Sequence, residues 1–330
     1  MMNKLRGVAL ITVMLLVALA AVIATQMLAR IQLQTQRTTN IAFNQQAYWY
    51  AMGAEAFAKR VLITAFKDEP EITHLQQIWA QGETSYPVDF GSISGEIKDQ
   101  QACLNLNALK KAPENTASAT KKTIPRAVFE RLIVLLNIDG IGTSDFEAAR
   151  LADALVDWLD SDSNISNVGG AEDNDYAGKE HPYLAANNYL ASISELRVIE
   201  HFSLNVIHAI KPFVCVLPNT DLHKININTL SAEQPELLQA LLDITKVDAE
   251  ELLSARRDEG YDNIEDFFNL PDVSRLNIKE DLKQQFVVDS EYFKLKASAS
   301  FNNSYFVMNS LLKVINNNQV TVISRRIGRD

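Results

Sequence analysis

Residues 6–29 read RGVALITVMLLVALAAVIATQMLA, and this stretch decides the fold of a chain of 330 residues. No charged residue occurs from Val8 to Ala29, and an α-helix needs about 20 such residues to cross the hydrocarbon core of a bilayer. Lys4 and Arg6 precede the apolar run, and basic flanks stay on the cytoplasmic side of a membrane. The sequence therefore predicts one membrane-spanning helix, with the rest of the chain on the outer side.

The helical pattern continues beyond the apolar run. After Arg30 the next proline is Pro70, and Gly53 is the only glycine between them. Small and apolar side chains recur there at helical spacing, at Ala47, Tyr50, Ala51, Ala54, Phe57, Ala58 and Val61. We expect one helix over residues 8–66, roughly 90 Å long, whose first half suits lipid and whose second half is amphipathic. A secretory signal peptide cut near residues 21–24 and a plain uncleaved anchor are the alternatives.

The residues around Gly7 resemble the processing site of type IV prepilins, in the order Arg6-Gly7-Val8-Ala9-Leu10-Ile11-Thr12. The resemblance implies that residues 1–7 are a leader, that prepilin peptidase cuts after Gly7, and that Val8 becomes a methylated N-terminus. Most members of that class carry Glu at the fifth mature position, where it neutralises the amine of the neighbouring subunit, but this chain has Thr12. An unpaired glutamate is costly within a membrane, and a subunit at the end of a filament has no distal neighbour to pair with. Thr12 therefore indicates a position at the filament end.

The rest of the chain, here called the head, predicts a small antiparallel sheet with a helical insertion. Apolar residues at alternate positions predict a strand over residues 293–301, and asparagine turns separate it from further strands over residues 305–315 and 320–327. Residues 88–99 predict an earlier strand, and helical patterns over 126–136, 145–159 and 249–257 lie between these regions. The expected fold class is α+β, a pilin-like long N-terminal helix with a small antiparallel sheet and a large inserted, mainly helical domain. The expected segments are the leader 1–7, the transmembrane part 8–29 and periplasmic part 30–66 of the helix, the first part of the pilin-like domain 67–110, the inserted domain 111–285 and the C-terminal strands 286–330.

One short motif occurs twice in the head. Residues 104–109 read LNLNAL and residues 225–230 read ININTL, and each stretch precedes a helical segment. Thr229 or Ser231 is expected to cap the helix that follows the second copy. The two stretches are either copies of one structural unit or similar strand-to-helix junctions that arose by chance.

The strongest chemical signal is acidic. Residues 139–175 carry ten carboxylates and a single base, Arg150. Two glycines at 169 and 170 allow the chain to turn back, which would bring the acidic residues on either side of them together. Hard oxygen ligands without cysteine favour calcium over zinc, although the spacing is not that of an EF-hand loop. A solvated acidic loop is the alternative interpretation.

Other functions find less support. The net charge of −10 and a pI near 5.1 argue against a general polyanion-binding surface. Residues 225–270 resemble helix-hairpin-helix modules, many of which bind DNA, but the hairpin at 244–247 lacks glycine and a second element at 140–142 has an acidic flank. Both are interpreted as packing modules, without nucleic acid as a partner. The five histidines form no HExxH motif, and GxSxG and P-loop motifs are absent, so we expect no enzyme. A membrane-anchored DNA-uptake protein and a secreted carboxylate hydrolase are the alternative classes.

Taken together, these features resemble the K-type minor pseudopilins of type II secretion systems (general secretion pathway protein K) over almost the whole length. The resemblance is carried by six stretches, at residues 6–12, 105–107, 157–160, 170–173 with Tyr176, 194–197 and 225–229. It implies a single-pass protein of the inner membrane of a Gram-negative bacterium, with the head in the periplasm. It also implies assembly with I- and J-type minor pseudopilins at the tip of a pseudopilus built from the major pseudopilin, where the large head would block the addition of further subunits.

The same resemblance implies calcium in the acidic loop and bears on the two cysteines. The implied ligands are Asp160, Asp162, Glu172, Asp173 and Asp175, with Asp157 and Glu195 as second choices. Cys103 and Cys215 would be reduced in a cytosolic protein and would tend to pair in an exported one. In an oxidising periplasm we expect them to form a disulfide, which would stabilise the head by roughly 4–5 kcal/mol in the chain-entropy model.

Overall fold

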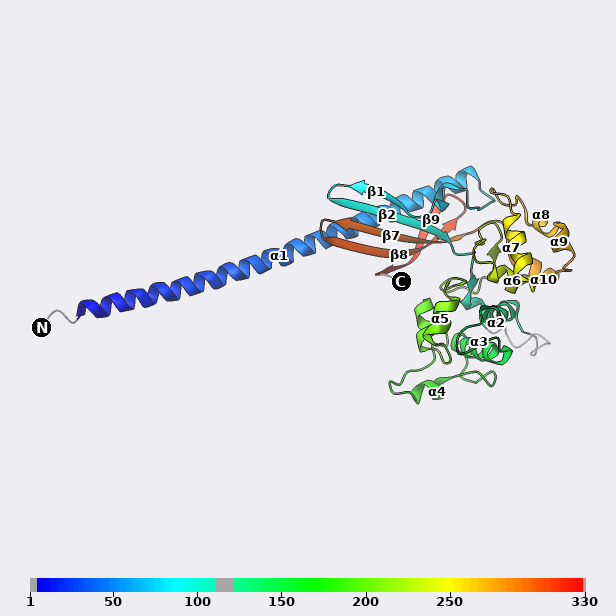
Figure 1. The fold of residues 1–330 in the computed structure, drawn as a ribbon, viewed down its shortest axis with the longest axis horizontal. Helices are drawn as coiled ribbons and strands as arrows, with labels where there is room; N and C mark the ends of the chain where they lie inside the picture. The colour runs from blue at the N-terminus through cyan, green and yellow to red at the C-terminus, as the bar shows by residue number, and fades with distance from the viewer. Residues whose placement is uncertain (1–4, 111–121, 329–330) are drawn as a thin grey trace.

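A computed structural model describes residues 5–110 and 122–328, and its first element is a continuous helix of 64 residues, α1 (Leu5–Asp68). A helix of this length extends about 96 Å. Its N-terminal half projects away from the head (Figure 1), and no part of its most apolar segment is buried by the rest of the chain. That segment has a mean hydropathy of 2.8 and is long enough to cross a membrane. The single long helix predicted from the sequence is therefore confirmed.

The second half of α1 lies on a five-stranded antiparallel sheet with strand order β1-β2-β7-β8-β9. The strands are β1 (Thr84–Val88), β2 (Gly91–Asp99), β7 (Tyr292–Phe301), β8 (Ser304–Ile315) and β9 (Gln319–Ile327). The three C-terminal strands are confirmed to within one residue at each end. The single strand predicted over residues 88–99 is wrong at its start, because the chain turns at Phe90 with φ of 61° and forms the hairpin of β1 and β2. A left-handed phenylalanine carries no sequence signal for a turn.

Small residues on α1 allow the helix to approach the sheet closely. Ala54, Ala58 and Leu62 pack against Phe293 and Leu295 of β7 in one apolar cluster. The predicted apolar stripe of α1 is confirmed for most of its members, but Phe57 is 55% exposed, with its ring centroid 6.0 Å from that of Tyr86 in the edge strand β1.

One buried charge interrupts this helix–sheet interface. Glu55 is 1% exposed and accepts two hydrogen bonds from Arg325, at 2.7 and 2.8 Å, and one from the Ser310 hydroxyl at 2.6 Å. Burial opposes ionisation, but these bonds outweigh it and hold the pKa of Glu55 below its usual value. These contacts tie the C-terminal half of α1 to β8 and β9.

The insertion lies at the end of the sheet remote from the N-terminus (Figure 1) and consists of two units. The first is closed by the parallel pair of β3 (Leu104–Asn105) and β4 (Val214–Cys215), and the second by β5 (Ile225–Asn226) and β6 (Phe286–Val287). The first unit contains the helices α2 (Ile124–Leu136), α3 (Asp145–Leu159), α4 (Asp173–Ala177) and α5 (Leu204–Ile210). The second contains α6 (Glu236–Leu242), α7 (Lys246–Ser254), α8 (Ile264–Phe268), α9 (Pro271–Ser274) and α10 (Glu280–Lys283). Short 3₁₀ helices are η1 (Ile78–Ala80), η2 (Leu106–Leu109) and η3 (Ile193–Val198).

The repeated motif has the same geometry in both units. Asn105 and Asn226 each accept a hydrogen bond from the backbone nitrogen two residues later, on Asn107 and Asn228. The amides of Asn107 and Asn228 then bridge backbone groups of later segments, at Leu190 and Leu217 in the first unit and at Tyr261 and Val288 in the second. The two stretches are therefore structurally equivalent copies of one unit.

Two details of the second unit differ from the sequence-based expectations. The helix α6 begins at Glu236 after Pro235, so neither Thr229 nor Ser231 caps it. Instead, the Thr229 hydroxyl donates to the buried Asp99 at 2.5 Å. The helix predicted over residues 249–257 begins earlier, at Lys246, because Thr245 and Asp248 form a capping box there.

The structure joins Cys103 and Cys215, which are 112 positions apart in sequence, in a disulfide with their Cα atoms 5.7 Å apart. The two cysteines lie beside the paired strands β3 and β4, where the chain enters and leaves the first unit. The bond therefore closes this unit at its base.

Candidate functional site

The acidic residues gather where α3 ends and the following loop returns. Asp157 lies in the last turn of α3, and Asp160 is its C-cap residue. The loop then passes so close to α3 that a Cβ atom on Gly169 would lie 2.4 Å from the Arg150 Cα atom, and one on Gly170 would lie 1.9 Å from Asp157 Oδ2. Glycine is required at both positions because of this close approach. The predicted doubling back at the two glycines is confirmed.

This return brings three of the predicted ligands together. Asp160, Asp162 and Glu172 each place one carboxylate oxygen within 4.8 Å of the others. Asp160 and Glu172 are buried, at 5% and 3% exposure, whereas Asp162 is partly exposed. The backbone of Asp162 donates to Asp160, and the backbone of Asn164 donates to Asp162, so the loop holds the carboxylates in place. Three convergent oxygens at this spacing suit a hard divalent cation.

Glu172 is the residue whose environment departs most from that of an ordinary carboxylate. It is the N-cap of α4, and its backbone N–H donates to the Asp175 carboxylate at 3.0 Å. Within residues 5–110 and 122–328, no hydrogen bond of standard geometry reaches either of its buried side-chain oxygens. Burial, followed by repulsion from Asp157, Asp160 and other nearby carboxylates, raises the pKa of Glu172 to about 7. A bound cation would remove both penalties, so the donor set fits a metal.

The other predicted ligands make contacts of their own. Asp173 accepts from the backbone of Ala185 at 3.0 Å, and Asp175 accepts from the backbone of Glu172 at 3.0 Å. Asp157 is completely buried and accepts from the backbone of Ser166, and its burial raises its pKa to about 6. Glu195 lies on η3 and accepts from the backbone of Ala191. The structure thus groups Asp160, Asp162 and Glu172, with Asp157 behind them.

Aromatic packing fixes the loop against α3. Tyr176 of α4 is fully buried, with its ring centroid 5.2 Å from Trp158 of α3 and 5.2 Å from the stacked ring of Tyr183. Trp158 precedes Asp160 by two residues and Tyr176 follows Glu172 by four, so this packing holds the chain segments of the two buried carboxylates against each other.

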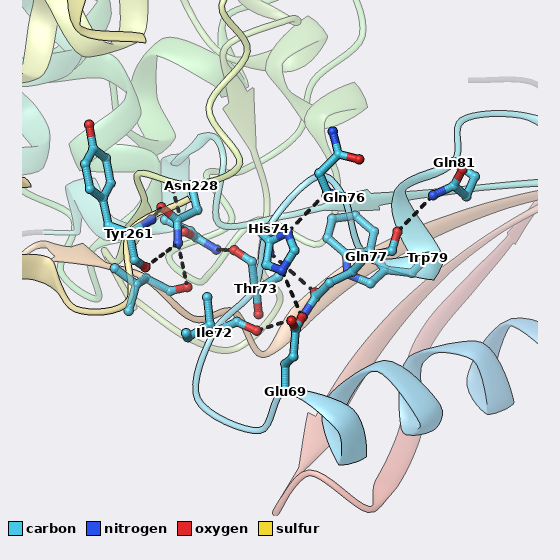
Figure 2. A network of polar contacts seen from close by, with 12 residues as sticks. Glu69, Ile72, Thr73, His74, Gln76, Gln77, Trp79, Gln81, Asn228 and Tyr261 are labelled. Atoms are coloured by element: carbon cyan, nitrogen blue, oxygen red, sulfur yellow. Dashed lines mark hydrogen bonds and ion pairs between the residues drawn. The ribbon is translucent and has the colours of Figure 1, made fainter. Parts of the chain in front are cut away.

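A second polar cluster, which was not found from the sequence, joins the insertion to the sheet. Thr73 follows α1, donates its backbone N–H to Val288 and accepts from the Asn226 amide (Figure 2). Nearby, Asp99 at the end of β2 accepts from the hydroxyls of Thr229 and Ser290, at 2.5 and 2.6 Å. Burial raises the pKa of Asp99 to about 6, although these bonds oppose the shift. The insertion is therefore fixed to the end of the sheet by buried hydrogen bonds.

The loop after α1 is braced by a network of its own. Glu69 accepts from His74 at 2.8 Å and from the Gln77 amide at 2.7 Å, and the Gln77 oxygen accepts from the Trp79 indole (Figure 2). Trp79 in turn packs on Phe293 of β7, with ring centroids 5.1 Å apart. This loop therefore links α1, the sheet and the second unit.

The helix-hairpin-helix-like elements take part in packing. The turn between α6 and α7 uses a left-handed Asp243, and the turn between α2 and α3 uses Gly140 and Gly142 with positive φ. Residues from α2, α3, α6 and α7 share one apolar core. This arrangement agrees with the interpretation of both elements as packing modules.

A helix that is apolar in its first half and packed on an antiparallel sheet in its second half defines a pilin-like subunit, here with a two-unit insertion. Family models described as type II secretion system protein K match residues 102–219 and 225–289, which are the two units of the insertion. The chain belongs to the type II secretion system protein K family. The predicted fold class and the predicted role as a minor pseudopilin of type II secretion are thereby confirmed.

Relatives and a solved structure agree with this assignment. The chain is 33% identical to type II secretion system protein K of Klebsiella pneumoniae, over 99% of this chain and 98% of that protein. It is 38% identical to the Aeromonas hydrophila protein of the same description, over 77% of each chain. One chain of the crystal structure of the GspK-GspI-GspJ complex from enterotoxigenic Escherichia coli matches with a TM-score of 0.79 at 32% identity, covering 89% of this chain and 100% of that one.

Proposed function

We propose that this chain is a non-enzymatic subunit that occupies the tip of the pseudopilus together with I- and J-type minor pseudopilins. The observation that carries the proposal is the large two-unit insertion at the end of the sheet remote from the membrane-spanning segment (Figure 1). A head of this size would obstruct a further subunit above it. The crystallised relative occurs in a complex with GspI and GspJ, which supports the same partners here.

Thr12 supports the tip position from within the apolar part of α1. Its hydroxyl donates to the backbone oxygen of Ala9 at 2.9 Å, so the side chain is satisfied within its own helix. A glutamate at this position would need the N-terminal amine of a neighbouring subunit. A subunit without such a neighbour is better served by a threonine. The DNA-uptake alternative has no comparable support.

The maturation pathway follows from the same segment. Prepilin peptidase would cut after Gly7 and leave Val8 as the N-terminus of α1, to be methylated. The apolar half of α1 would then anchor the protein in the inner membrane and pack beside the helix of the major pseudopilin. The head would lie in the periplasm, where the disulfide between Cys103 and Cys215 is chemically reasonable.

Calcium is the proposed metal of the acidic cluster, held by Asp160, Asp162 and Glu172. A bound calcium ion would neutralise the mutual repulsion of the carboxylates and link the end of α3 to the start of α4. Asp157 would support the site from behind through its bonds to the Ser166 backbone. Its role would be structural, because it would fix the returning loop of the first unit.

The tip position is tested by labelling pseudopili. The full chain, carrying an epitope at its C-terminus, is co-expressed with its I- and J-type partners and an excess of the major pseudopilin, and sheared filaments are examined by immunogold electron microscopy. We expect one label at one end of a filament. Labels spread along the filaments would contradict the proposal, as would a failure of the epitope to capture the two partners.

A further inference from the structure

A cleft separates the first unit of the insertion from the outer face of the sheet. It has a volume of about 140 Å³ and lies between η3 and α5 on one side and β7, β8 and β9 on the other. Phe293 and Leu295 of β7 point toward α1, so Lys294 between them points to the opposite face, into the cleft. Packing of α1 among other helices would therefore leave the cleft accessible.

The cleft is basic in a chain whose net charge is −10. Arg197, His208 and Lys211 line it from the insertion, and Lys294 and Arg326 line it from the sheet. Among the described residues that line it there is no Asp or Glu. A concave surface that carries one sign of charge concentrates ligands of the opposite sign.

The position of one cation is set by a contact across the cleft. The Arg326 guanidinium of β9 donates to the backbone oxygen of Ala191 at 2.8 Å, beside η3. Glu195, the acidic residue of η3, uses one carboxylate oxygen to accept from the Ala191 backbone. Glu195 keeps its negative charge but does not line the cleft, whereas Arg197 and Lys211 do.

The uncharged part of the lining is mixed, with polar groups from Gln100, Ser194, Asn309, Ser310 and Ser324 and a set of apolar side chains. Ile193, Ile207, Val216 and Leu311 contribute to the wall between the basic residues. An inorganic anion would leave these side chains without a partner. A peptide that alternates carboxylates with apolar side chains matches both features, because its charges meet the basic residues while its apolar groups cover the wall.

We propose that this cleft binds an acidic, partly apolar peptide segment of a partner protein. Anionic lipid of the membrane that holds α1 is too distant. Ser310 borders the cleft and donates to Glu55, which follows Ala29 by 26 residues and so lies about 39 Å along the helix from the apolar segment. The inference does not depend on calcium or on the position of the subunit in the filament.

Fluorescence polarisation of the purified full chain in detergent tests the proposal. The probe is a fluorescein-labelled twelve-residue peptide that alternates Asp or Glu with Leu or Val, and the comparison peptide has Lys in place of each acidic residue. The acidic peptide should bind, more weakly as salt rises, and the lysine peptide should not. Arg197→Glu combined with Lys211→Glu should weaken binding by about tenfold or more, because each substitution replaces an attractive charge contact with a repulsive one.

The matched control is Lys279→Glu, an exposed lysine in the second unit away from the cleft, which should leave binding within about twofold, as expected for a distant screened charge. Circular dichroism and thermal melting establish that each variant is folded. Equal binding of the two peptides, or unchanged binding by the double variant, would overturn the proposal. Tighter binding of inorganic phosphate or of a single-stranded oligonucleotide would overturn the assignment to a peptide.

Discussion

Glu172→Gln should have opposite effects on the stability of the head with and without calcium. The substitution keeps the shape of the side chain and removes its charge. In chelator at pH 8 the wild-type carboxylate is ionised, buried and repelled by neighbouring carboxylates, which raise its pKa from 4.5 to about 7. After discounting for solvent screening, this shift corresponds to a destabilisation on the order of 1–3 kcal/mol, which the glutamine would relieve.

In calcium the effect should reverse, because the glutamine removes one charged ligand of the three that converge within 4.8 Å. A hundredfold excess of calcium over its dissociation constant adds about 2.7 kcal/mol to the free energy of unfolding of the wild type. For a domain of this size that gain raises the melting temperature by about 5–10 °C. The variant should show a much smaller rise at the same calcium concentration.

Differential scanning calorimetry of the full chain in detergent measures the melting temperatures of the wild type and of the variant, each in calcium and in chelator. Glu180→Gln is the matched control, because this exposed residue lies just after α4 and outside the cluster. The melting temperature of this control should equal that of the wild type, both in calcium and in chelator. If Glu172→Gln shifts the melting temperature by the same amount and in the same direction in both buffers, the cluster does not bind calcium.

Three further changes test other parts of the structure. Replacing both Cys103 and Cys215 with serine should lower the free energy of unfolding by up to about 4–5 kcal/mol. If dithiothreitol left the urea midpoint of the wild type unchanged, that result would contradict a stabilising disulfide. Arg325→Ala should lower the free energy of unfolding, measured in urea, by about 2–4 kcal/mol, because it leaves the Glu55 carboxylate buried without its partner. Glu55→Gln should lower it by less. A larger loss for Glu55→Gln than for Arg325→Ala would show that the buried carboxylate does not depend on Arg325. Thr12→Glu should reduce the amount of the subunit in membranes several-fold, measured by immunoblot, because an unpaired carboxylate in a bilayer costs about 2.5–3.5 kcal/mol. Thr12→Val should leave this amount unchanged. Normal assembly of the Thr12→Glu variant would argue against a tip position.

The elements that were predictable have strong local signals. The strand β7 alternates apolar and polar residues, and asparagine turns separate β7, β8 and β9, so the bounds of these strands follow from the sequence. The bounds of the edge strand β1 could not be predicted from the sequence, because the strand contains Pro87 and exposes most of its residues. The turn that follows it depends on a left-handed Phe90.

The parts that were not predictable depend on distant partners. Asp99 receives hydrogen bonds from residues 127 to 191 positions later in the chain, and no local pattern indicates that they meet. The acidic loop was visible as composition, and its glycines indicated the turn. Which carboxylates converge depends on α4, whose first turn directs Asp173 and Asp175 to backbone donors while Glu172 faces Asp160.

The intact mass and the N-terminal peptide of the protein extracted from the membranes of its native host test the central claim most directly. We expect a chain that begins at Val8 and carries an N-methyl group, because a pilin-like subunit reaches the pseudopilus only after its leader is removed. A chain that begins near residue 25, or that still begins at Met1 or Met2, would contradict assembly through the prepilin pathway.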